Sequence, residues 1–565
     1  MTSSNKNMNA DCLSFQKDEE NRRRRSANYK PNIWKHGFLH SLPTKYDKEE
    51  SAMQLVRLLI EVKGIFVEKS EVLQKLELVD WIQKLGVANY FEKEVNEFLE
   101  TTTFKNPSAQ ESLHVPALSF RLLRQHGYKV SPDVLLRKFF NENGTMLSKI
   151  SCGDDVKDIM ELFEASHLRF EEENILEEAK SVVINSLKDT FNVPSSININ
   201  YEHSERVFHA LELPSHWRVP WFDVKWHVKQ YHKEKHMEHH LLQLAKLNFN
   251  LIQLQLRKEV KELSRWWENL GIEKELSFAR NRLVESFMCS AGVAVQPKYK
   301  SLRKWLTKLI TFILVIDDVY DIHASFEEVK LFTAAFERWD AKEIEELPEC
   351  MRICFNSLKE VTDETAYEIA GEKNFNMVLS YIKKAWIEFC KALFEEAKWY
   401  SMEYIPSLKE YLSNAWISSS GSVILLHIYF ATMHEEVTYH EIDQFLHKYE
   451  DLMYNISLII RLCNDLGTTV AERERGDAAS SILCYMNEME VSEDKARKHI
   501  EEMINNAWKK INWYGTNGVG SMEPFITQAR NAARMAHTLY QNGDGFGIQD
   551  LDIKEHISSL LVEPL

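Results

Sequence analysis

Three aspartates stand close together near the middle of the 565-residue chain: Asp317, Asp318 and Asp321. On a helix, residues four apart share one face and lie about 6 Å apart along the axis. Carboxylates on one face repel each other, and a hard cation such as Mg²⁺ relieves that repulsion by taking oxygen ligands. The three aspartates are therefore candidate metal ligands. A solvated acidic helix end is the alternative interpretation of this motif alone.

A second group of oxygen-bearing side chains follows in the last quarter of the chain. Asn464, Thr468 and Glu472 are spaced i, i+4 and i+8, so on a helix they form one stripe over two turns. An amide, a hydroxyl and a carboxylate can together ligate one Mg²⁺. For this stripe alone, helix capping and surface polarity are the simpler interpretation.

Arginines accompany both motifs. Arg280 and Arg282 precede the aspartates, and Arg461 stands three residues before Asn464, on the same helical face. Guanidinium groups bind phosphate with paired hydrogen bonds and keep their charge. Each arginine alone is more simply a surface residue. Together, the two stripes and the arginines predict a site that binds a diphosphate through Mg²⁺ and stabilises it as a leaving group.

Each stripe follows an apolar helical segment. Residues 305–315 read WLTKLITFILV, and residues 456–460 read ISLII. A polar rim above an apolar floor suits a substrate with a hydrocarbon chain, and aromatic side chains on that floor could stabilise a carbocation by cation–π contact.

Helical periodicity extends from about residue 50 to the C-terminus, and strand-like alternation is weak. With only 18 Gly and 13 Pro, few strand reversals are expected, so we predict an all-α fold. The two prolines between Glu212 and Trp221 predict a break between helical regions. In the second half we expect helices at 241–263, 276–293, 302–320, 375–400, 408–433, 441–472 and 493–513.

The composition limits the possible binding partners of the protein and indicates its cellular compartment. A formal net charge of −16 argues against a nucleic-acid partner. The eight cysteines lack paired Cys-x-x-Cys motifs, which weighs against zinc and favours a reducing compartment. The longest mostly apolar run, 309–316, is too short to span a membrane. Acidic residues in the first 20 positions disfavour a signal or transit peptide, so we expect a cytoplasmic protein.

With these motifs in place, the chain resembles plant terpene synthases over nearly its whole length. The Asp317 motif is similar to the family's aspartate-rich motif, the Asn464 stripe to its second metal motif, and Arg280-x-Arg282 to its diphosphate-binding arginines. The resemblance implies an all-α fold with two helical domains. Residues 1–23 would be a disordered arm, 24–222 a non-catalytic, barrel-like N-terminal domain, and 223–565 the C-terminal class I catalytic domain.

Residues near both ends match further features of the family. Arg24 and Arg25, eight residues and then Trp34 fit its RR-x8-W sequence, which implies a lid over the mouth of the site rather than a solvated charge run. Asp544, in the sequence Asp-Gly-Phe-Gly, resembles the closing loop that would exclude water. An Asp-x-Asp-Asp motif is not found in the first half, so protonation-initiated chemistry is not expected.

The resemblance also implies the role of each site residue. Three Mg²⁺ ions, with Mn²⁺ as the alternative ion, would bind a small isoprenoid diphosphate. The implied metal ligands are Asp317, Asp318, Asp321, Asn464, Thr468 and Glu472. The implied diphosphate-binding residues are Arg280, Asp317, Asp321, Arg461 and Asn464. The implied catalytic residues, which assist departure of the leaving group, are Arg280, Arg282 and Arg461. A monomer without nucleic-acid or membrane partners is expected.

Finer similarity points to the α-farnesene synthase subgroup, at residues 24–34, 123–131 and 454–459. Where many cyclising relatives carry aromatics, this chain has Cys289 and, after a polar helix break at 418–420, Gly421. Fewer aromatics would favour an acyclic product such as α-farnesene from farnesyl diphosphate. Alternatives are an acyclic monoterpene such as β-ocimene from geranyl diphosphate, or water capture to nerolidol or linalool. A chain-elongating prenyltransferase would carry two Asp-Asp-x-x-Asp motifs, and a helical scaffold would need none of these residues.

Overall fold

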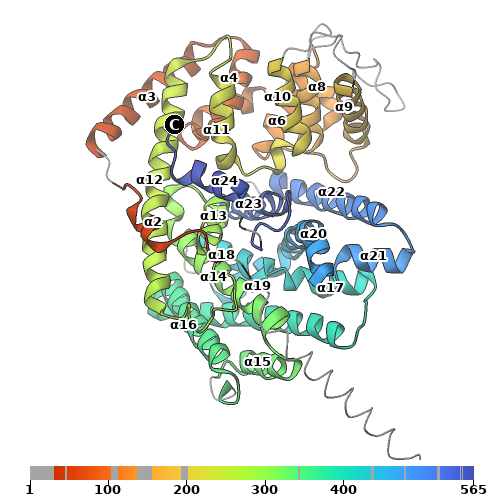
Figure 1. Ribbon diagram of the computed structural model, residues 1–565. Coiled ribbons are helices and arrows are strands. Elements are labelled where there is room, and N and C mark those ends of the chain that lie inside the picture. The colour runs from red at the N-terminus through yellow and green to blue at the C-terminus, as the bar shows by residue number, and fades with distance from the viewer. Residues whose placement is uncertain are drawn as a thin grey trace, which may run out of the picture. The chain divides into compact units, whose positions relative to one another are not determined.

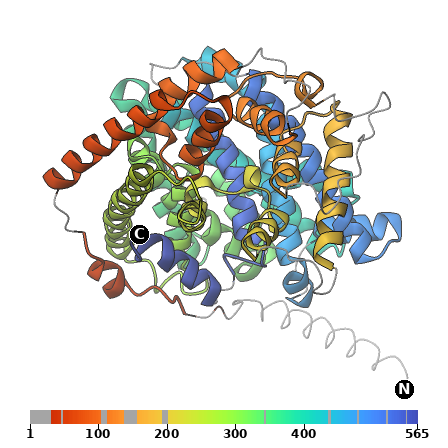
Figure 2. The same cartoon turned by 90° about the horizontal axis from the view of Figure 1, so that it is seen from above.

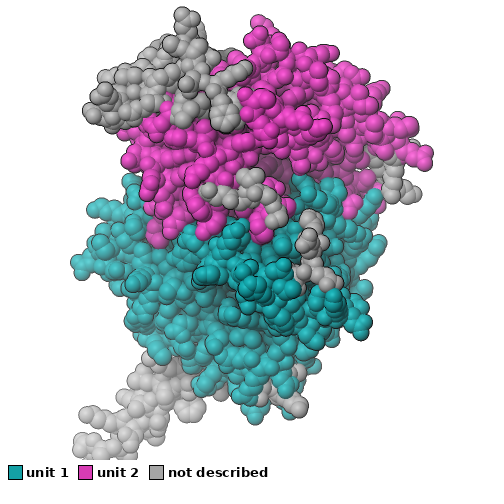
Figure 3. Space-filling model, turned by 180° about the vertical axis from the view of Figure 1, so that it is seen from behind, with its two compact units in different colours: residues 1–42, 257–502, 539–558 teal, residues 43–256, 503–538, 559–565 magenta. Residues whose placement is uncertain are grey.

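The computed structural model describes residues 29, 31–44, 48–102, 112–136, 156–192, 201–340, 344–433, 438–475, 479–517, 522–547, 549 and 551–565. Every regular element in these ranges is a helix, which confirms the all-α prediction (Figures 1 and 2). The chain forms two compact units, coloured separately in Figure 3. Unit 1 comprises residues 1–42, 257–502 and 539–558, and unit 2 comprises 43–256, 503–538 and 559–565. The predicted division at 222/223 stays a prediction, and the predicted arm, 1–23, lies outside the described residues.

Unit 2 is built from short helices around an apolar core. Leu76, Leu122 and Leu162, from three different helices, are fully buried. Buried Arg121 is paired with two carboxylates, one of them Asp80, so its charge is compensated. The helices are α3 (Lys48–Glu68), α4 (Val72–Lys84), α5 (Glu92–Thr102), α6 (His114–Gln125), α7 (Pro132–Leu136), α8 (Val156–Ser166), α9 (Asn174–Asn192), α10 (Tyr201–Glu212) and α11 (Pro220–Tyr231).

The predicted break between Glu212 and Trp221 is confirmed. Helix α10 ends at Glu212, a 3-10 turn covers Ser215–Trp217, and α11 begins at Pro220. Proline is tolerated there because the first N–H groups of a helix have no partner within the helix.

Unit 1 holds the long helices of the second half of the chain, among them α14, which packs against α13 and α18, and α20, which packs against α17 and α18. Its helices are α2 (His36–Ser41), α13 (Leu283–Val293), α14 (Lys300–Asp318), α15 (Phe326–Arg338), α16 (Glu349–Ser401), α17 (Leu408–Ser418), α18 (Gly421–Thr432), α19 (Tyr439–Lys448), α20 (Glu450–Arg475) and α21 (Ser481–Met489). The helices with residues in both units are α12 (His239–Leu270), α22 (Glu493–Asn517), α23 (Glu523–Tyr540) and α24 (Leu551–Leu561).

Local sequence sets where several of these helices begin. A Ser or Thr side chain accepts from the backbone N–H three residues on, and the Glu there bonds back to the cap residue, before α15, α17 and α19. Each such capping box satisfies two N–H groups that the helix itself leaves unpaired, and removal of the cap residue costs about 1 kcal/mol.

The structure corrects three predicted helices. The helix expected at 276–293 begins only at Leu283, so Arg280 and Arg282 lie in the loop before it. The segment 441–472 divides at Tyr449 into α19 and α20. The segment 408–433 divides into α17 and α18 because Ser420 adopts a left-handed conformation, with φ 63°. The helical periodicity alone does not show these divisions, although the polar run at 418–420 indicates the break between α17 and α18.

Within the described residues, one stretch, Leu408–Thr432, is long and apolar enough to cross a membrane. Its most apolar window is 72% buried, and the core helix of a protein that spans no membrane passes the same test. This stretch is therefore weak support for a membrane span.

Helices α18 and α20 approach closely at Gly421. A Cβ built on Gly421 would lie 2.2 Å from the Oγ of Ser457 on α20. Such a contact cannot be accommodated without moving a helix, since the Cα of Ser457 would lie only 2.9 Å away. Only glycine fits this position with the present packing.

Gly421→Ala is expected to destabilise unit 1 by about 1–3 kcal/mol, because overpacking a tight interior forces backbone shifts. Gly37→Ala is the matched control, near the start of α2, where nothing lies within 4 Å of the added Cβ. Thermal unfolding followed by circular dichroism measures both. Equal melting temperatures for the two variants would contradict the close approach.

Candidate active site

The three aspartates end α14, but not on one regular α-helical face. Asp317 and Asp318 are its last residues, and Asp321 lies in the π-helical turn η5 (Val319–His323). The expectation of a plain i, i+4 spacing is therefore wrong in detail. Asp317 is partly exposed, Asp321 is exposed, and Asp318 is 1% exposed.

Arg280 reaches the first two aspartates from the loop before α13. Its Nη2 donates to Asp317 Oδ2 at 2.5 Å, and its backbone N–H donates to Asp318 Oδ2 at 2.7 Å. Tyr29 donates its hydroxyl to Asp318 Oδ1 at 3.0 Å. Burial raises the pKa of Asp318, and the charge of Arg280 offsets part of that rise. Burial disfavours the charge of Arg280, but the two aspartates outweigh this and hold its pKa well above the usual range.

The second stripe lies on α20 as predicted. Asn464 Oδ1 accepts from Arg461 Nη1 at 3.3 Å, and Thr468 Oγ1 donates to the backbone oxygen of Asn464 at 2.8 Å. Glu472 belongs to the same helix, but its side chain lies outside the described part of the structure. Arg461 Nη2 also donates to Ser418 Oγ, at the end of α17, at 3.0 Å.

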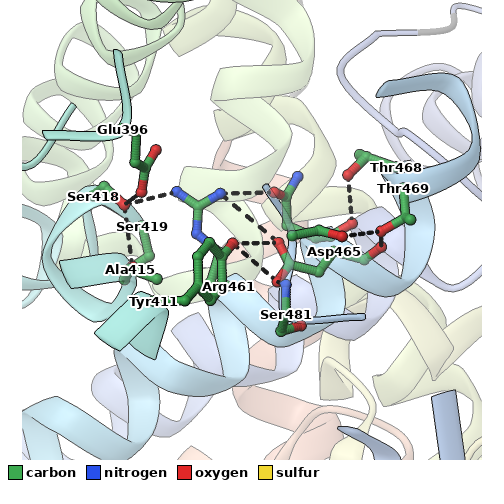
Figure 4. A network of polar contacts seen from close by, with 12 residues as sticks. Glu396, Tyr411, Ala415, Ser418, Ser419, Arg461, Asp465, Thr468, Thr469 and Ser481 are labelled. Atoms are coloured by element: carbon green, nitrogen blue, oxygen red, sulfur yellow. Dashed lines mark hydrogen bonds and ion pairs between the residues drawn. The ribbon is translucent and has the colours of Figure 1, made fainter. Parts of the chain in front are cut away.

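Asp465, between the predicted ligands of this stripe, is a buried anchor (Figure 4). Both of its carboxylate oxygens accept from the Tyr411 hydroxyl at 3.0 Å, and Oδ2 accepts from the Ser481 N–H at 2.9 Å. Burial raises the pKa of Asp465, and Arg461 and these two donors offset part of the rise. Asp465 thereby joins α17 and α21 to α20.

The two motifs face one region of unit 1. Burial works against the charge of Arg461, but neighbouring acidic groups, Asp317 among them, hold its pKa well above the usual range. Tyr540, at the end of α23, is half-buried; the loss of solvent around its hydroxyl raises its pKa, and both Arg280 and Arg461 are near enough to lower it in part. Asp544 and Cys289 contribute to the raised pKa of the same tyrosine. Asp317, Arg280 and Arg461 therefore lie in one neighbourhood, and Tyr540 is a neighbour that sequence reasoning missed.

Arg282 has a different partner from Arg280. Its Nε donates to the backbone oxygen of Phe546 at 2.6 Å and its Nη2 to that of Gly547 at 3.3 Å. Asp544 Oδ1 in turn accepts from the N–H groups of Phe546 and Gly547. In this structure Arg282 holds the C-terminal loop, and its predicted contact with diphosphate stays a prediction.

The N-terminal segment also joins this loop region. Trp34 Nε1 and Gln549 Nε2 both donate to Glu285 Oε1, at 3.0 Å and 2.7 Å. Gln549 Oε1 accepts from the N–H of Ile33 at 3.1 Å. Of the predicted lid residues, Trp34 belongs to this network, and Asp544 lies in the loop that Arg282 holds. Arg24 and Arg25 lie outside the described residues.

The donor set fits a divalent ion of the Mg²⁺ type. Carboxylate, amide and hydroxyl oxygens of Asp317, Asp321, Asn464 and Thr468 are hard ligands. Among the residues that the structure describes, no three His, Cys, Asp or Glu side chains form a group that could hold a metal ion. Mg²⁺ is commonly held by one or two carboxylates together with substrate phosphates, so the residues present fit an ion shared with a diphosphate.

Tyr411→Phe is expected to lower the free energy of unfolding by about 1.5–3 kcal/mol, since it removes a donor to a buried carboxylate. Tyr404→Phe is the control, because Tyr404 also donates to a carboxylate, Glu410, at 2.8 Å, but both groups are exposed. Thermal melting of the two variants checks this. The anchoring role of Asp465 fails if Tyr404→Phe destabilises the protein as much as Tyr411→Phe does.

Comparison with known proteins places this geometry in a family. The terpene synthase N-terminal domain matches residues 33–211, and the terpene synthase metal-binding domain matches 268–510. The chain is 51% identical to alpha-farnesene synthase of Ricinus communis over 547 residues, 96% of this chain and 95% of that one. It is also 51% identical to (E,E)-alpha-farnesene synthase of Malus domestica over 552 residues, 96% and 94% of the two chains.

A solved structure has a similar fold. Isoprene synthase from grey poplar, in complex with three Mg²⁺ ions and dimethylallyl-S-thiolodiphosphate, superposes with a TM-score of 0.84 at 38% identity, over 94% of this chain and 99% of that one. With helical architecture, site geometry and sequence in agreement, the chain belongs to the terpene synthase family and has its class I fold.

Proposed function

We propose that this chain is a sesquiterpene synthase that converts (2E,6E)-farnesyl diphosphate to acyclic (E,E)-α-farnesene and diphosphate. The observation that carries the reaction class is the convergence of two arginine-bound oxygen stripes, Arg280 with Asp317 and Arg461 with Asn464. The choice of substrate and product is supported by the 51% identity to two α-farnesene synthases over 96% of the chain.

Mg²⁺ is the proposed metal, with three ions per site, as in the poplar isoprene synthase complex, and with Mn²⁺ as the alternative ion. Asp317 and Asp321 would hold metal on one side, and Asn464, Thr468 and Glu472 on the other. Bound metal would supply Lewis-acid stabilisation of the diphosphate. Asp318, although also predicted as a ligand, is engaged by Arg280 and Tyr29, so its proposed part is to orient Asp317.

The protein's own residues then bind and orient the substrate. Arg280 and Arg461 are proposed to donate N–H groups to diphosphate oxygens as the carbon–oxygen bond breaks, with Arg282 as a further predicted contributor. Arg282 and Asp544 hold the C-terminal loop, whose proposed task is to exclude water from the cation. Loss of a proton from carbon 4 gives α-farnesene, and the released diphosphate is the proposed acceptor.

An acyclic product is proposed from the lack of aromatic side chains at two positions. Cys289 on α13 is buried. Gly421 is the first residue of α18, at a position where no side chain fits. A cyclised cation would find less cation–π stabilisation there than in an aromatic wall.

A monomer located in the cytoplasm is our proposal for the state of the enzyme. Among the described residues, none of the six cysteines is in a disulfide bond, which supports the proposed reducing compartment.

The first experiment is a product assay. Purified protein with Mg²⁺ receives farnesyl or geranyl diphosphate separately, and the volatiles are identified by gas chromatography–mass spectrometry. We expect α-farnesene as the main product from farnesyl diphosphate. Mainly cyclic products would contradict the acyclic proposal. Nerolidol would indicate water capture, and activity limited to geranyl diphosphate, giving β-ocimene or linalool, would move the substrate assignment.

Asp317→Ala is expected to lower kcat about 100-fold or more, because it removes a proposed metal ligand beside the leaving group. Glu346→Ala, which removes an exposed carboxylate before α16, is the control and is expected to keep wild-type kcat. Chelation of divalent metal should abolish turnover by the wild type. Full activity of Asp317→Ala, with correct folding by circular dichroism, would contradict the metal assignment.

A further inference from the structure

Arg461 is held by hydrogen bonds to residues of two helices, and a third helix backs one of these bonds (Figure 4). Within α20, Nη1 donates to Asn464 Oδ1 at 3.3 Å. From α17, the hydroxyl of Ser418 accepts from Nη2 at 3.0 Å. The same hydroxyl donates to Oε1 of Glu396 on α16. Ser418 therefore stands between a guanidinium and a carboxylate and bonds to both.

The position of this hydroxyl is fixed by its surroundings. Ser418 is 4% exposed and Glu396 is 8% exposed, so neither side chain can readily replace its protein partners with water. Asn414 Nδ2 bridges Glu396 Oε1 and the backbone oxygen of Ala392, at 3.3 Å and 3.0 Å, which ties the carboxylate to its own helix. Because Ser420 adopts a left-handed conformation, α17 ends at Ser418 and its side chain stays at the helix end.

A hydroxyl is suited to this place because it accepts and donates at once. Without it, a half-buried N–H of Arg461 and a buried oxygen of Glu396 would each lose a partner. These two groups have opposite charge, so a direct ion pair between them would be favoured. Such a pair would draw the guanidinium from Asn464 toward α16. The hydroxyl thus separates Glu396 from Arg461 while linking them.

We propose that Ser418, backed by Glu396, is a positioning residue that holds Arg461 in register with Asn464 and keeps its charge available for the diphosphate. This inference rests on the proposed function, since it concerns residues that support Arg461 at the same diphosphate site. Glu396 and Ser418 do not contact the substrate in this assignment. They act through the guanidinium of Arg461.

The test compares Ser418→Ala and Ser418→Thr in the full-length protein. The affinity for inorganic diphosphate with Mg²⁺ is measured by calorimetry, and kcat and KM with farnesyl diphosphate are measured separately. Ser418→Ala is expected to weaken diphosphate binding about 10-fold or more and to lower kcat, from the loss of a hydrogen bond to a charged group. Ser418→Thr keeps the hydroxyl and is expected to stay within about 3-fold of the wild type.

Ser413→Ala is the matched control, because Ser413 lies on the same helix with an exposed hydroxyl bonded to the backbone oxygen of Glu410. If Ser418→Ala does not fold, the same measurements are made on Ser418→Cys. A thiol fills nearly the same space as the hydroxyl but is a weak hydrogen-bonding group, so the same loss of diphosphate affinity is expected. Unchanged diphosphate affinity in a folded Ala or Cys variant overturns the inference, as does an equal loss in the Thr variant. Failure of the wild type to bind diphosphate or to release a terpene overturns the proposed function as well.

Discussion

A buried carboxylate at the end of an apolar helix is the constraint on which the site depends. Asp318 is 1% exposed, and a charge in such a place costs several kcal/mol unless it is paired and hydrogen-bonded. The backbone and guanidinium of Arg280 and the hydroxyl of Tyr29 supply those partners. Meeting this requirement fixes the loop before α13 and the N-terminal segment against the end of α14. Asp317, the residue before Asp318, is thereby held beside the guanidinium of Arg280.

The second motif has the same arrangement of a buried anchor beside an arginine-bound residue. Asp465 is 1% exposed and is held by Tyr411 and Ser481, while its neighbour Asn464 bonds to Arg461. In both motifs one residue of an adjacent pair is buried and joins secondary elements, and the other carries the oxygen that points to an arginine. Burial raises the pKa of both anchors, Asp318 and Asp465, so each depends on its donors to stay ionised. The positions of Asp317 and Asn464 thus depend on their buried neighbours, Asp318 and Asp465.

Sequence spacing predicted the all-α fold, the stripe on α20 and the presence of Arg461 on the same face, because these are properties of one helix and its period. It missed the π-helical turn that carries Asp321, since the apolar pattern does not register an extra residue in a turn. It also missed Tyr29, which bonds to Asp318, and Glu396, which is linked to Arg461 through Ser418, because these residues come together only after folding. The run of three serines at 418–420 indicates a helix break, but it does not indicate that Ser418 bonds to an arginine.

The two arginines are held in different ways, and this has a consequence for how a diphosphate would engage them. Arg280 is bonded directly to two carboxylates, whereas Arg461 is bonded to a hydroxyl and an amide, with Asp465 only at 3.9 Å. Hydrogen bonds between two charged groups are stronger than those to neutral partners. An arriving phosphate oxygen would therefore compete more easily for Arg461 than for Arg280. On the proposed function, Arg461 would engage the diphosphate with the smaller loss of existing bonds, while the bonds from Arg280 to Asp318 would preserve the position of Asp317.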